Sequence, residues 1–324
     1  MLNAAIVGLG WWGKELVRSV QGSSPRIGFS RAVTLEPDLA REFAAEQGLT
    51  LGTSYDEALA DAKIEAVVLA TPHTLHRRQV EAAARAGKHV FCEKPFALTK
   101  TDAEAALAAC RRAKVALGVG HNRRLWPSLK EMHRLIGAGA LGVVMHAEGT
   151  FGHDWLANQP AGNWRNAPEE TKSGGMTGMG IHLLDAFSFL VGPMQRIAAL
   201  GTRRTLPLAT GDTTAALIEF ENGATGSLMT TLKMPYLWRL AIYGRDLSLE
   251  STGEDHLVLH RPGRAPEVQE LAAADHIGEN LESFAAAARG EGAYHISDGH
   301  ILHTVAALEA VFRSAAANGA WEAV

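Results

Sequence analysis

The sequence predicts an α/β protein with an N-terminal doubly wound parallel sheet and a C-terminal α+β domain built on an open, mostly antiparallel sheet. A G-x-G-x-x-G pattern lies between a short apolar run and a segment with helical spacing, and strand and helix patterns alternate through about residue 120. From Ile197 to Leu271 several strand patterns follow one another. We therefore expect domains over 1–120 and 121–324, with a last helix that could pack back on the first domain.

The glycine pattern indicates a dinucleotide site because a strand precedes it and a helix follows it. Gly8 permits the tight turn, Gly10 lets the backbone approach a pyrophosphate, and Gly13 lets helix and strand pack closely. The N–H groups at the helix start would hold the phosphates. Trp11 and Trp12 either cover the phosphates or pack between the domains. The pattern alone is weak, since 33 of 324 residues are Gly.

The end of the second strand, expected over 27–33, bears on the choice of cofactor. An acidic residue about twenty residues after the glycines favours NAD, whereas a small residue or a nearby Arg leaves room for the 2′-phosphate of NADP. Thr34 ends the strand, Glu36 lies just beyond it and Arg31 just before it. The sequence therefore predicts NAD or NADP without deciding between them.

The continuous apolar run at 66–70 is typical of a strand buried on both faces of a parallel sheet, and the next strand is expected over 89–92. Ligands lie outside the carboxyl ends of such strands. Further elements of this domain are expected as helices over 37–46, 54–59, 75–86 and 101–113 and a strand over 115–119. Besides the glycine loop, the residues expected to line the cofactor cleft are Thr34, Ala70, Thr71, Pro72, His73, His76, Glu93 and Lys94.

The second domain is expected from residue 121. A polar loop with aromatics is expected over 150–173, and a loop of this length is usually either functional or disordered. Asn222-Gly223 is a strong hairpin signal between two strands. The expected elements are helices over 127–136, 181–190, 277–289 and 299–318 and strands over 143–149, 213–220, 224–231, 238–243 and 257–260.

Composition excludes several functional classes. Lys plus Arg is 31 against Asp plus Glu 35, a net charge of −4, so no basic surface favours nucleic acid or membrane. Cys92 and Cys110 alone cannot form a disulfide framework or a cysteine-rich metal site. No apolar run reaches the roughly 18 residues of a membrane span, and a strand expected from residue 3 leaves no room for a signal peptide. We expect a cytoplasmic protein with a small-molecule substrate.

Several segments together resemble the glucose-fructose oxidoreductase, inositol dehydrogenase and MocA (Gfo/Idh/MocA) family of NAD(P)-dependent oxidoreductases. The segments are 4–13, 86–95 with Glu93-Lys94-Pro95, Asn163-Trp164-Arg165, 180–185 and the closing helix with Arg313-Ser314. The resemblance implies a Rossmann domain, a C-terminal domain whose open sheet often forms oligomer contacts, and hydride transfer between a nicotinamide and a sugar, cyclitol or related alcohol. It therefore implies a homo-oligomer, a dimer or tetramer.

One position departs from the family pattern. Family members typically carry an Asp four residues before the His of the Gly-x-His-x-x-Asp segment, and this chain has Gly178 there. The acid of the Asp–His pair is missing. Two alternatives to a sugar or polyol dehydrogenase follow: a dihydrodiol-type dehydrogenase that uses a single acid–base group, and a nucleotide-binding protein without catalysis.

Lys94 and His182 are the predicted catalytic residues. A lysine beside a cationic nicotinamide would have a lowered pKa and could take the hydroxyl proton, or it could merely pair with Glu93. His182 could contact substrate as its acid–base partner, or be a core histidine. Asp185, three residues on, could orient the imidazole or pair elsewhere.

Further residues have weaker assignments. His153 and Asp154 could supply the relay that Gly178 cannot, or be solvated loop residues. Trp164 and Arg165 could close over the nicotinamide or bind substrate, or simply pack under the loop. Arg123 and the adjacent Arg124 could reach the substrate or pair across the hinge, and no metal site is expected because His73, His76 and His182 have no ligand spacing of a known type.

Overall fold

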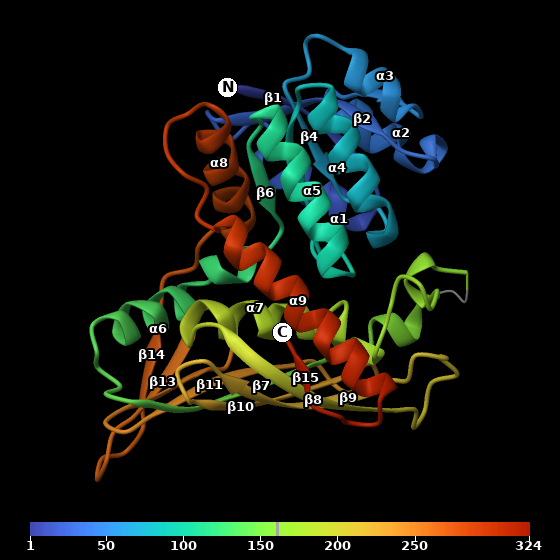
Figure 1. The fold of residues 1–324 in the computed structure, drawn as a ribbon. Helices are drawn as coiled ribbons and strands as arrows, with labels where there is room; N and C mark the ends of the chain where they lie inside the picture. Colours follow the sequence, from blue (N-terminus) through green and yellow to red (C-terminus); the bar gives the residue numbers. More distant parts are fainter. Residues whose placement is uncertain (160–161) are drawn as a thin grey trace. The chain divides into compact units, whose positions relative to one another are not determined.

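The computed structural model describes residues 1–159 and 162–324 (Figure 1). The chain forms two compact units. Unit 1 comprises Met1–Asn122 and Asp275–Ile301, and unit 2 comprises Arg123–Ala274 and Leu302–Val324. The first crossing lies two residues beyond the boundary expected from the sequence, and the return of 275–301 to unit 1 was not expected.

Unit 1 is built on a six-stranded sheet of order β3-β2-β1-β4-β5-β6, and every pairing in it is parallel. This confirms the doubly wound parallel sheet. The alternation missed the short β3, which pairs with the end of β2. The strands are β1 Leu2–Val7, β2 Ile27–Val33, β3 Thr50–Gly52, β4 Ala66–Leu69, β5 His89–Cys92 and β6 Leu117–Val119.

The helices of unit 1 begin where local capping chemistry predicts. Ser54 accepts a hydrogen bond from the N–H of Glu57, and Thr99 accepts one from the N–H of Asp102. The helices are α1 Trp11–Val20, α2 Pro37–Glu46, α3 Tyr55–Ala60, α4 His76–Arg85, α5 Lys100–Ala113 and α8 His276–Ala288, with a 3₁₀ turn η1 at His73–Leu75. The α8 residues Leu281 and Phe284 are fully buried in the core of this sheet. The ring of Phe284 lies 5.7 Å from that of Phe91.

Unit 2 is built on a nine-stranded sheet of order β14-β13-β12-β11-β7-β10-β9-β8-β15. All pairings are antiparallel except that of β10 with β7, so the predicted open, mostly antiparallel sheet is confirmed. The Asn222-Gly223 hairpin between β9 and β10 is also confirmed, with Gly223 at φ +85°. The strands are β7 Val144–Gly152, β8 Met194–Thr202, β9 Thr213–Phe220, β10 Thr225–Thr231, β11 Leu237–Gly244, β12 Ser248–Ser251, β13 His256–His260, β14 Glu267–Glu270 and β15 Glu322–Ala323.

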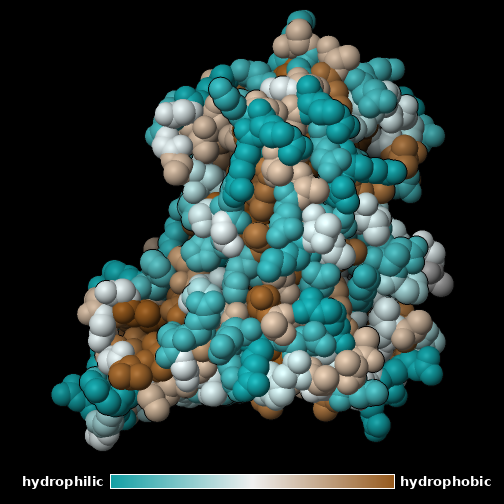
Figure 2. Space-filling model, viewed as in Figure 1, coloured by the Kyte–Doolittle hydropathy of each residue, from teal (hydrophilic) through white to brown (hydrophobic). Residues whose placement is uncertain are grey.

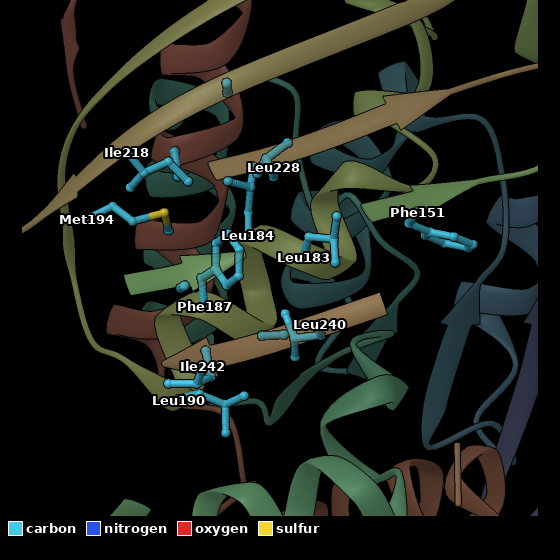
Figure 3. Packing of buried hydrophobic residues seen from close by; sticks show 14 of the residues in the cluster. Phe151, Leu183, Leu184, Phe187, Leu190, Met194, Ile218, Leu228, Leu240 and Ile242 are labelled. Atoms are coloured by element: carbon cyan, nitrogen blue, oxygen red, sulfur yellow. The ribbon is translucent and has the colours of Figure 1, made fainter. Parts of the chain in front are cut away.

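The helix α7, Gly180–Leu190, forms the centre of the unit 2 core. Its Leu183, Leu184 and Phe187 are fully buried and lie among side chains of the sheet, such as Leu228 and Leu240 (Figure 3). The other helices of this part are α6 Pro127–Gly137 and α9 Asp298–Ala316, with 3₁₀ turns η3 Leu156–Asn158, η4 Trp164–Asn166 and η5 Gly174–Met176. Most of α9 belongs to unit 2, and the expectation that the last helix packs back on the first domain stays a prediction.

A carboxylate closes the loop between β8 and β9. Asp212 is 1% exposed and accepts hydrogen bonds from the backbone N–H groups of Arg204, Thr205 and Leu206. Burial alone would raise the pKa of Asp212, but these hydrogen bonds outweigh burial and lower the pKa to about 2. The loop is therefore held by an ionised carboxylate at neutral pH.

Three features of the surface and composition bear on the expectations from the sequence: surface hydropathy, membrane-spanning helices and metal-binding clusters. On the face shown in Figure 2, hydrophilic residues predominate and hydrophobic ones form small patches. Within 1–159 and 162–324, no helix combines the length and apolarity needed to cross a membrane. In the same residues, no three or more His, Cys, Asp or Glu side chains are grouped to bind a metal ion. Cys92 and Cys110 are buried thiols.

Candidate functional site

The glycine loop, residues 8–13, joins β1 to α1 in unit 1. Gly8 has φ +93°, and a Cβ there would lie 2.5 Å from the backbone oxygen of Ala70. A Cβ on Gly13 would collide with the backbone oxygen of Gly8. Gly10 differs, because no heavy atom of the described chain lies within 4 Å of the position that its Cβ would take. The fold therefore requires glycine at 8 and 13, whereas the space beside Gly10 is open to a ligand.

The start of α1 offers the chemistry of an anion site. Gly10 is the N-cap of this helix, and no side chain caps it in the part of the chain that the structure describes. The first N–H groups and the positive end of the helix dipole therefore suit a phosphate. The loop thus fits a dinucleotide pyrophosphate. Trp11 is 63% exposed, and its ring lies 5.4 Å from that of Trp12.

The carboxyl ends of the central strands meet at one edge of the sheet, beside the glycine loop. The N–H of Ala70 donates to the oxygen of Val7 at 2.8 Å, and the N–H of Glu93 donates to the oxygen of Leu69 at 2.9 Å. Lys94 follows directly after Glu93 and is half-buried. The structure therefore brings the predicted Gly8, Ala70, Glu93 and Lys94 backbones to the same edge.

Glu93 supports the backbone of the turn that carries Lys94. Its side chain is buried, and its carboxylate accepts a hydrogen bond of 3.1 Å from the N–H of Lys94. A Cβ on Gly120 would collide with this carboxylate, so glycine at 120 makes the room that it occupies. The turn is thus fixed from within unit 1.

His73 and His76 lie at the start of α4, with ring centroids 5.8 Å apart. His76 is fully buried, and its ring nitrogens lie at hydrogen-bond distance from the carbonyl oxygens of Thr71 and Pro95. A direct contact of these nitrogens with a nucleotide would require both interactions to break. The hydroxyl of Thr71 donates to the side chain of Gln79 at 2.5 Å.

At the end of β2, the hydroxyl of Thr34 accepts a hydrogen bond of 3.2 Å from the N–H of Glu36, and Thr34 itself is half-buried. The guanidinium of Arg31 lies 3.1 Å from the carboxylate of Glu57 and 3.7 Å from that of Asp61. Acidic groups in and after α3 therefore hold Arg31, the arginine next to the strand end that bears on the choice between NAD and NADP.

In unit 2, three of the predicted residues gather around one aromatic ring. The centroid of Phe151 lies 6.2 Å from the ring of His182 and 5.7 Å from the ring of His153. The guanidinium carbon of Arg123 lies 4.1 Å from the same centroid. Phe151 is 3% exposed and had no signal in the sequence beyond being an aromatic residue near a strand end.

Two indoles complete an aromatic box around Arg123. The guanidinium carbon lies 4.4 Å from the ring of Trp126 and 4.5 Å from that of Trp238. Trp238 of β11 is directly opposite Phe151 of β7 in the sheet. Burial lowers the pKa of Arg123 to about 10, so the group stays a cation at neutral pH. The box holds this cation against Phe151, the residue whose ring also lies close to His153 and His182.

Asp185 is engaged by an arginine within unit 2. Its two carboxylate oxygens accept hydrogen bonds from Arg124 at 2.8 and 2.7 Å, and the two side chains are 2% and 3% exposed. Sequence reasoning considered Asp185 as an orienter of His182 and Arg124 as a hinge residue. The structure shows them as one buried, bidentate ion pair.

Gly178 is exposed and has room for a side chain. No heavy atom among the described residues lies within 4 Å of its would-be Cβ, and its φ is not left-handed. Of the two residues considered as a substitute relay, His153 accepts a hydrogen bond of 3.0 Å from the N–H of Trp155, and Asp154 is exposed. The relay role of both stays a prediction.

Arg165 is stacked on two indoles. Its guanidinium carbon lies 4.1 Å from the ring of Trp164 and 5.3 Å from that of Trp155. The backbone N–H of Arg165 donates to the side-chain oxygen of Asn163 at 3.0 Å. A guanidinium recognises carboxylate and hydroxyl groups through the N–H donors in its plane. The predicted contacts of Trp164 and Arg165 with nicotinamide or substrate stay predictions.

Comparison with known proteins accounts for both units. Residues 2–121 match the NAD-binding Rossmann fold of an oxidoreductase family, and residues 129–250 match the GFO/IDH/MocA C-terminal domain. The chain is 29% identical over 311 residues to levoglucosan dehydrogenase of Pseudarthrobacter phenanthrenivorans, across 85% of this chain and 77% of that one. A solved structure of levoglucosan dehydrogenase with NADH and levoglucosan has a TM-score of 0.88 at 26% identity, over 100% and 99% of the two chains.

A second relative has a different reaction name. The chain is 33% identical over 190 residues to 2,7-anhydro-N-acetylneuraminate hydratase of Mediterraneibacter gnavus, across 59% of this chain. The match spans about half of that relative, 49% of its length. With the glycine loop and the sheet order, these matches show that the chain belongs to the GFO/IDH/MocA oxidoreductase family and carries its NAD-binding Rossmann domain.

Proposed function

We propose that the protein is an NAD(P)-dependent oxidoreductase that transfers a hydride between a nicotinamide and a sugar, polyol, cyclitol or related cyclic alcohol. The observation that carries this proposal is the sheet edge of unit 1. The open space beside Gly10 follows β1 and the turn of Lys94 follows β5, and these two strands lie on either side of β4. Relatives named for sugar substrates support the choice of substrate class.

Lys94 and His182 share the proton chemistry in this proposal. A bound nicotinamide would supply the hydride acceptor for the alcohol carbon, and the hydroxyl proton would then have to leave. The amine of Lys94 takes that proton in oxidation and returns it in reduction. His182 serves as partner by holding the substrate hydroxyl or passing the proton on.

The first experiment separates binding from turnover. Titrating the purified protein with NADH and NADPH, followed by fluorescence, tests cofactor binding. Absorbance of NAD(P)H is then followed with sugars, anhydro sugars, polyols, cyclitols and dihydrodiols. Turnover of a sugar or polyol supports the proposal, whereas failure to bind either nucleotide contradicts it.

Lysine variants at the two ends of β5 test the role of Lys94. Lys94→Ala should abolish turnover but keep nucleotide binding. Lys88, just before β5, donates to the carbonyls of Asp61 and Ile64, so Lys88→Ala should lower the melting temperature while keeping turnover. An active Lys94→Ala variant would remove this residue from the mechanism.

Because Gly178 stands where the family typically has an Asp, two other functions remain as alternatives. A dihydrodiol-type dehydrogenase needs one acid–base group only, and its mark would be turnover of dihydrodiols without turnover of sugars. A non-catalytic nucleotide-binding protein would bind the cofactor tightly and turn over nothing in the panel. The same assays therefore decide among the three functions.

We further propose a homo-oligomer formed through the outer face of the unit 2 sheet. Leu200 and Leu217 lie on neighbouring strands of this face and are 59% and 57% exposed. Exposed apolar side chains on a sheet face favour association. Light scattering should show a smaller particle for Leu200→Glu/Leu217→Glu than for the wild type. An unchanged mass would contradict this face as the interface.

A further inference from the structure

The ring of His76 joins the ends of two neighbouring strands in unit 1. His76 is the first residue of α4 and is 0% exposed. Its Nδ1 lies 2.8 Å from the carbonyl oxygen of Pro95, which follows Lys94 after β5. Its Nε2 lies 3.0 Å from the carbonyl oxygen of Thr71, which follows β4. One side chain therefore contacts the backbone on both sides of the strand edge.

The two partners of the ring have the same polarity. A carbonyl oxygen can only accept a hydrogen bond, and a neutral imidazole has one N–H donor and one acceptor nitrogen. A neutral ring would thus satisfy one carbonyl and direct a lone pair at the other at hydrogen-bond distance. Both contacts are favourable only when both nitrogens carry a proton, that is, when His76 is an imidazolium.

Two effects oppose this charge. Burial disfavours the charged form, and so does the position at the N-terminus of α4, where the helix dipole is positive. The charged and titratable neighbours of His76 in unit 1 include Arg77 and Arg78, which follow it in α4, and His73, whose ring is 5.8 Å away. Glu93 and Lys94 belong to the turn whose Pro95 carbonyl contacts the ring. Hydrogen bonds from both nitrogens to carbonyl dipoles favour the charged form, since each stabilises it directly.

We propose that His76 is a positioning residue that donates from both ring nitrogens and clamps the turn of Lys94 to the end of β4. The inference rests on the proposed function, because it concerns the placement of the amine of Lys94. Pro95 is the next residue after Lys94, so a shift of the Pro95 carbonyl moves the Lys94 backbone with it. A misplacement of about 1 Å in a catalytic group can cost roughly a hundredfold in rate.

The first test needs no activity. In the ¹⁵N-labelled wild-type protein at neutral pH, both ring nitrogens of His76 should give resonances of protonated nitrogen, assigned by their loss in His76→Gln. His89, whose Nδ1 accepts a hydrogen bond of 2.9 Å from the N–H of Ala116, should show one unprotonated nitrogen. A neutral His76 would overturn the clamp even if the enzyme proves to be a dehydrogenase.

The second test uses the same substitution at the two ends of one strand. His76→Gln removes the double donor at the carboxyl end of β5, and His89→Gln changes a half-buried histidine at the amino end. We expect kcat per nucleotide-binding site to fall at least about tenfold in His76→Gln and to stay within about threefold in His89→Gln. The nucleotide Kd and the KM of His76→Gln should change by less than about threefold.

A pH profile distinguishes positioning from general loss of stability. Moving the amine of Lys94 changes its surroundings and hence its pKa, so the pH dependence of kcat should shift in His76→Gln and not in His89→Gln. Equal kcat values and profiles in the two variants would overturn the positioning role. A wild type that oxidises no alcohol would contradict the proposed function, while the resonances of His76 would still decide the protonation of the ring.

Discussion

The buried ion pair of unit 2 gives a quantitative test of the structure. Arg124 binds both oxygens of Asp185, and its guanidinium carbon lies 5.0 Å from the ring of Phe189. Replacing Arg124 by Met removes the cation and leaves a carboxylate in an apolar surrounding. Breaking a buried pair in this way costs about 3–5 kcal/mol because the remaining charge is uncompensated.

The chain contains a matched control in the same unit. Arg196 also binds both oxygens of a carboxylate, that of Glu219 at 2.6 and 2.7 Å, and lies 4.8 Å from the ring of Trp321. It differs in burial, since the side chains of Arg196 and Glu219 are 47% and 34% exposed, against 2% and 3% in the buried pair. An exposed pair contributes roughly 0–1 kcal/mol, so Arg196→Met should cost little.

Urea unfolding at neutral pH, followed by tryptophan fluorescence and circular dichroism, measures both variants. Arg124→Met should unfold at a clearly lower urea concentration than Arg196→Met, and Arg124→Met/Asp185→Leu should regain most of the loss, because a buried pair replaced by apolar residues is often neutral. Equal losses in the two single variants would refute the burial of the pair. Turnover of the double variant per nucleotide-binding site then shows whether Asp185 has any role beyond its pairing with arginine.

Three further predictions concern single positions. Gly8→Ala should lower the melting temperature, because Gly8 has a positive φ and a backbone oxygen lies close to the position of a Cβ. Gly10→Ala should leave the melting temperature within about 1–2 °C but weaken NAD(H) binding at least about tenfold. Thermal melts and fluorescence titration measure the two effects. Asp212→Asn should cost roughly 2 kcal/mol at pH 7. Since the folded pKa of Asp212, about 2, is below the unfolded value of about 3.9, this difference from the wild type should be lost as pH falls from about 5 to 2 in acid unfolding series. Gly178→Asp should fold with a stability within about 0.5 kcal/mol of wild type, and its pH profile of kcat should differ from the wild type if the new carboxylate acts on His182.

The parts of the fold that were predictable have strong local signals. The apolar runs of β4 and β5 are buried on both faces, and a parallel sheet requires that composition. The three-residue β3 has no such apolar run. Its residues are exposed or half-buried, and it is too short to show an alternation of apolar and polar residues. The placement of α8 in unit 1 was also not predictable, because burial of Leu281 and Phe284 is decided by tertiary packing with residues far away in the chain.

The candidate site also has parts that were predictable from the sequence and parts that were not. The glycine loop and Lys94 were predictable, because backbone geometry and strand ends fix their places. The aromatic box of Arg123 was not, since Phe151 and Trp238 meet only through the register of β7 with β11. The double contact of His76 was not predictable either. Its partners are backbone carbonyls of two turns, and residue types do not show where a backbone carbonyl in a turn points.

The fold requires some glycines of this chain and not others. Gly8 and Gly13 are required by collisions with backbone oxygens, so no side chain could stand there whatever the reaction. Gly178 meets no such constraint, because its backbone suits any residue and its surroundings leave room for a carboxylate. The absence of an acid at this position is therefore a chemical property of the site and not a cost of folding. The proposed proton transfer through Lys94 and His182 therefore has to work without an acid at position 178, and Gly178→Asp should change the pH profile of kcat without changing the fold.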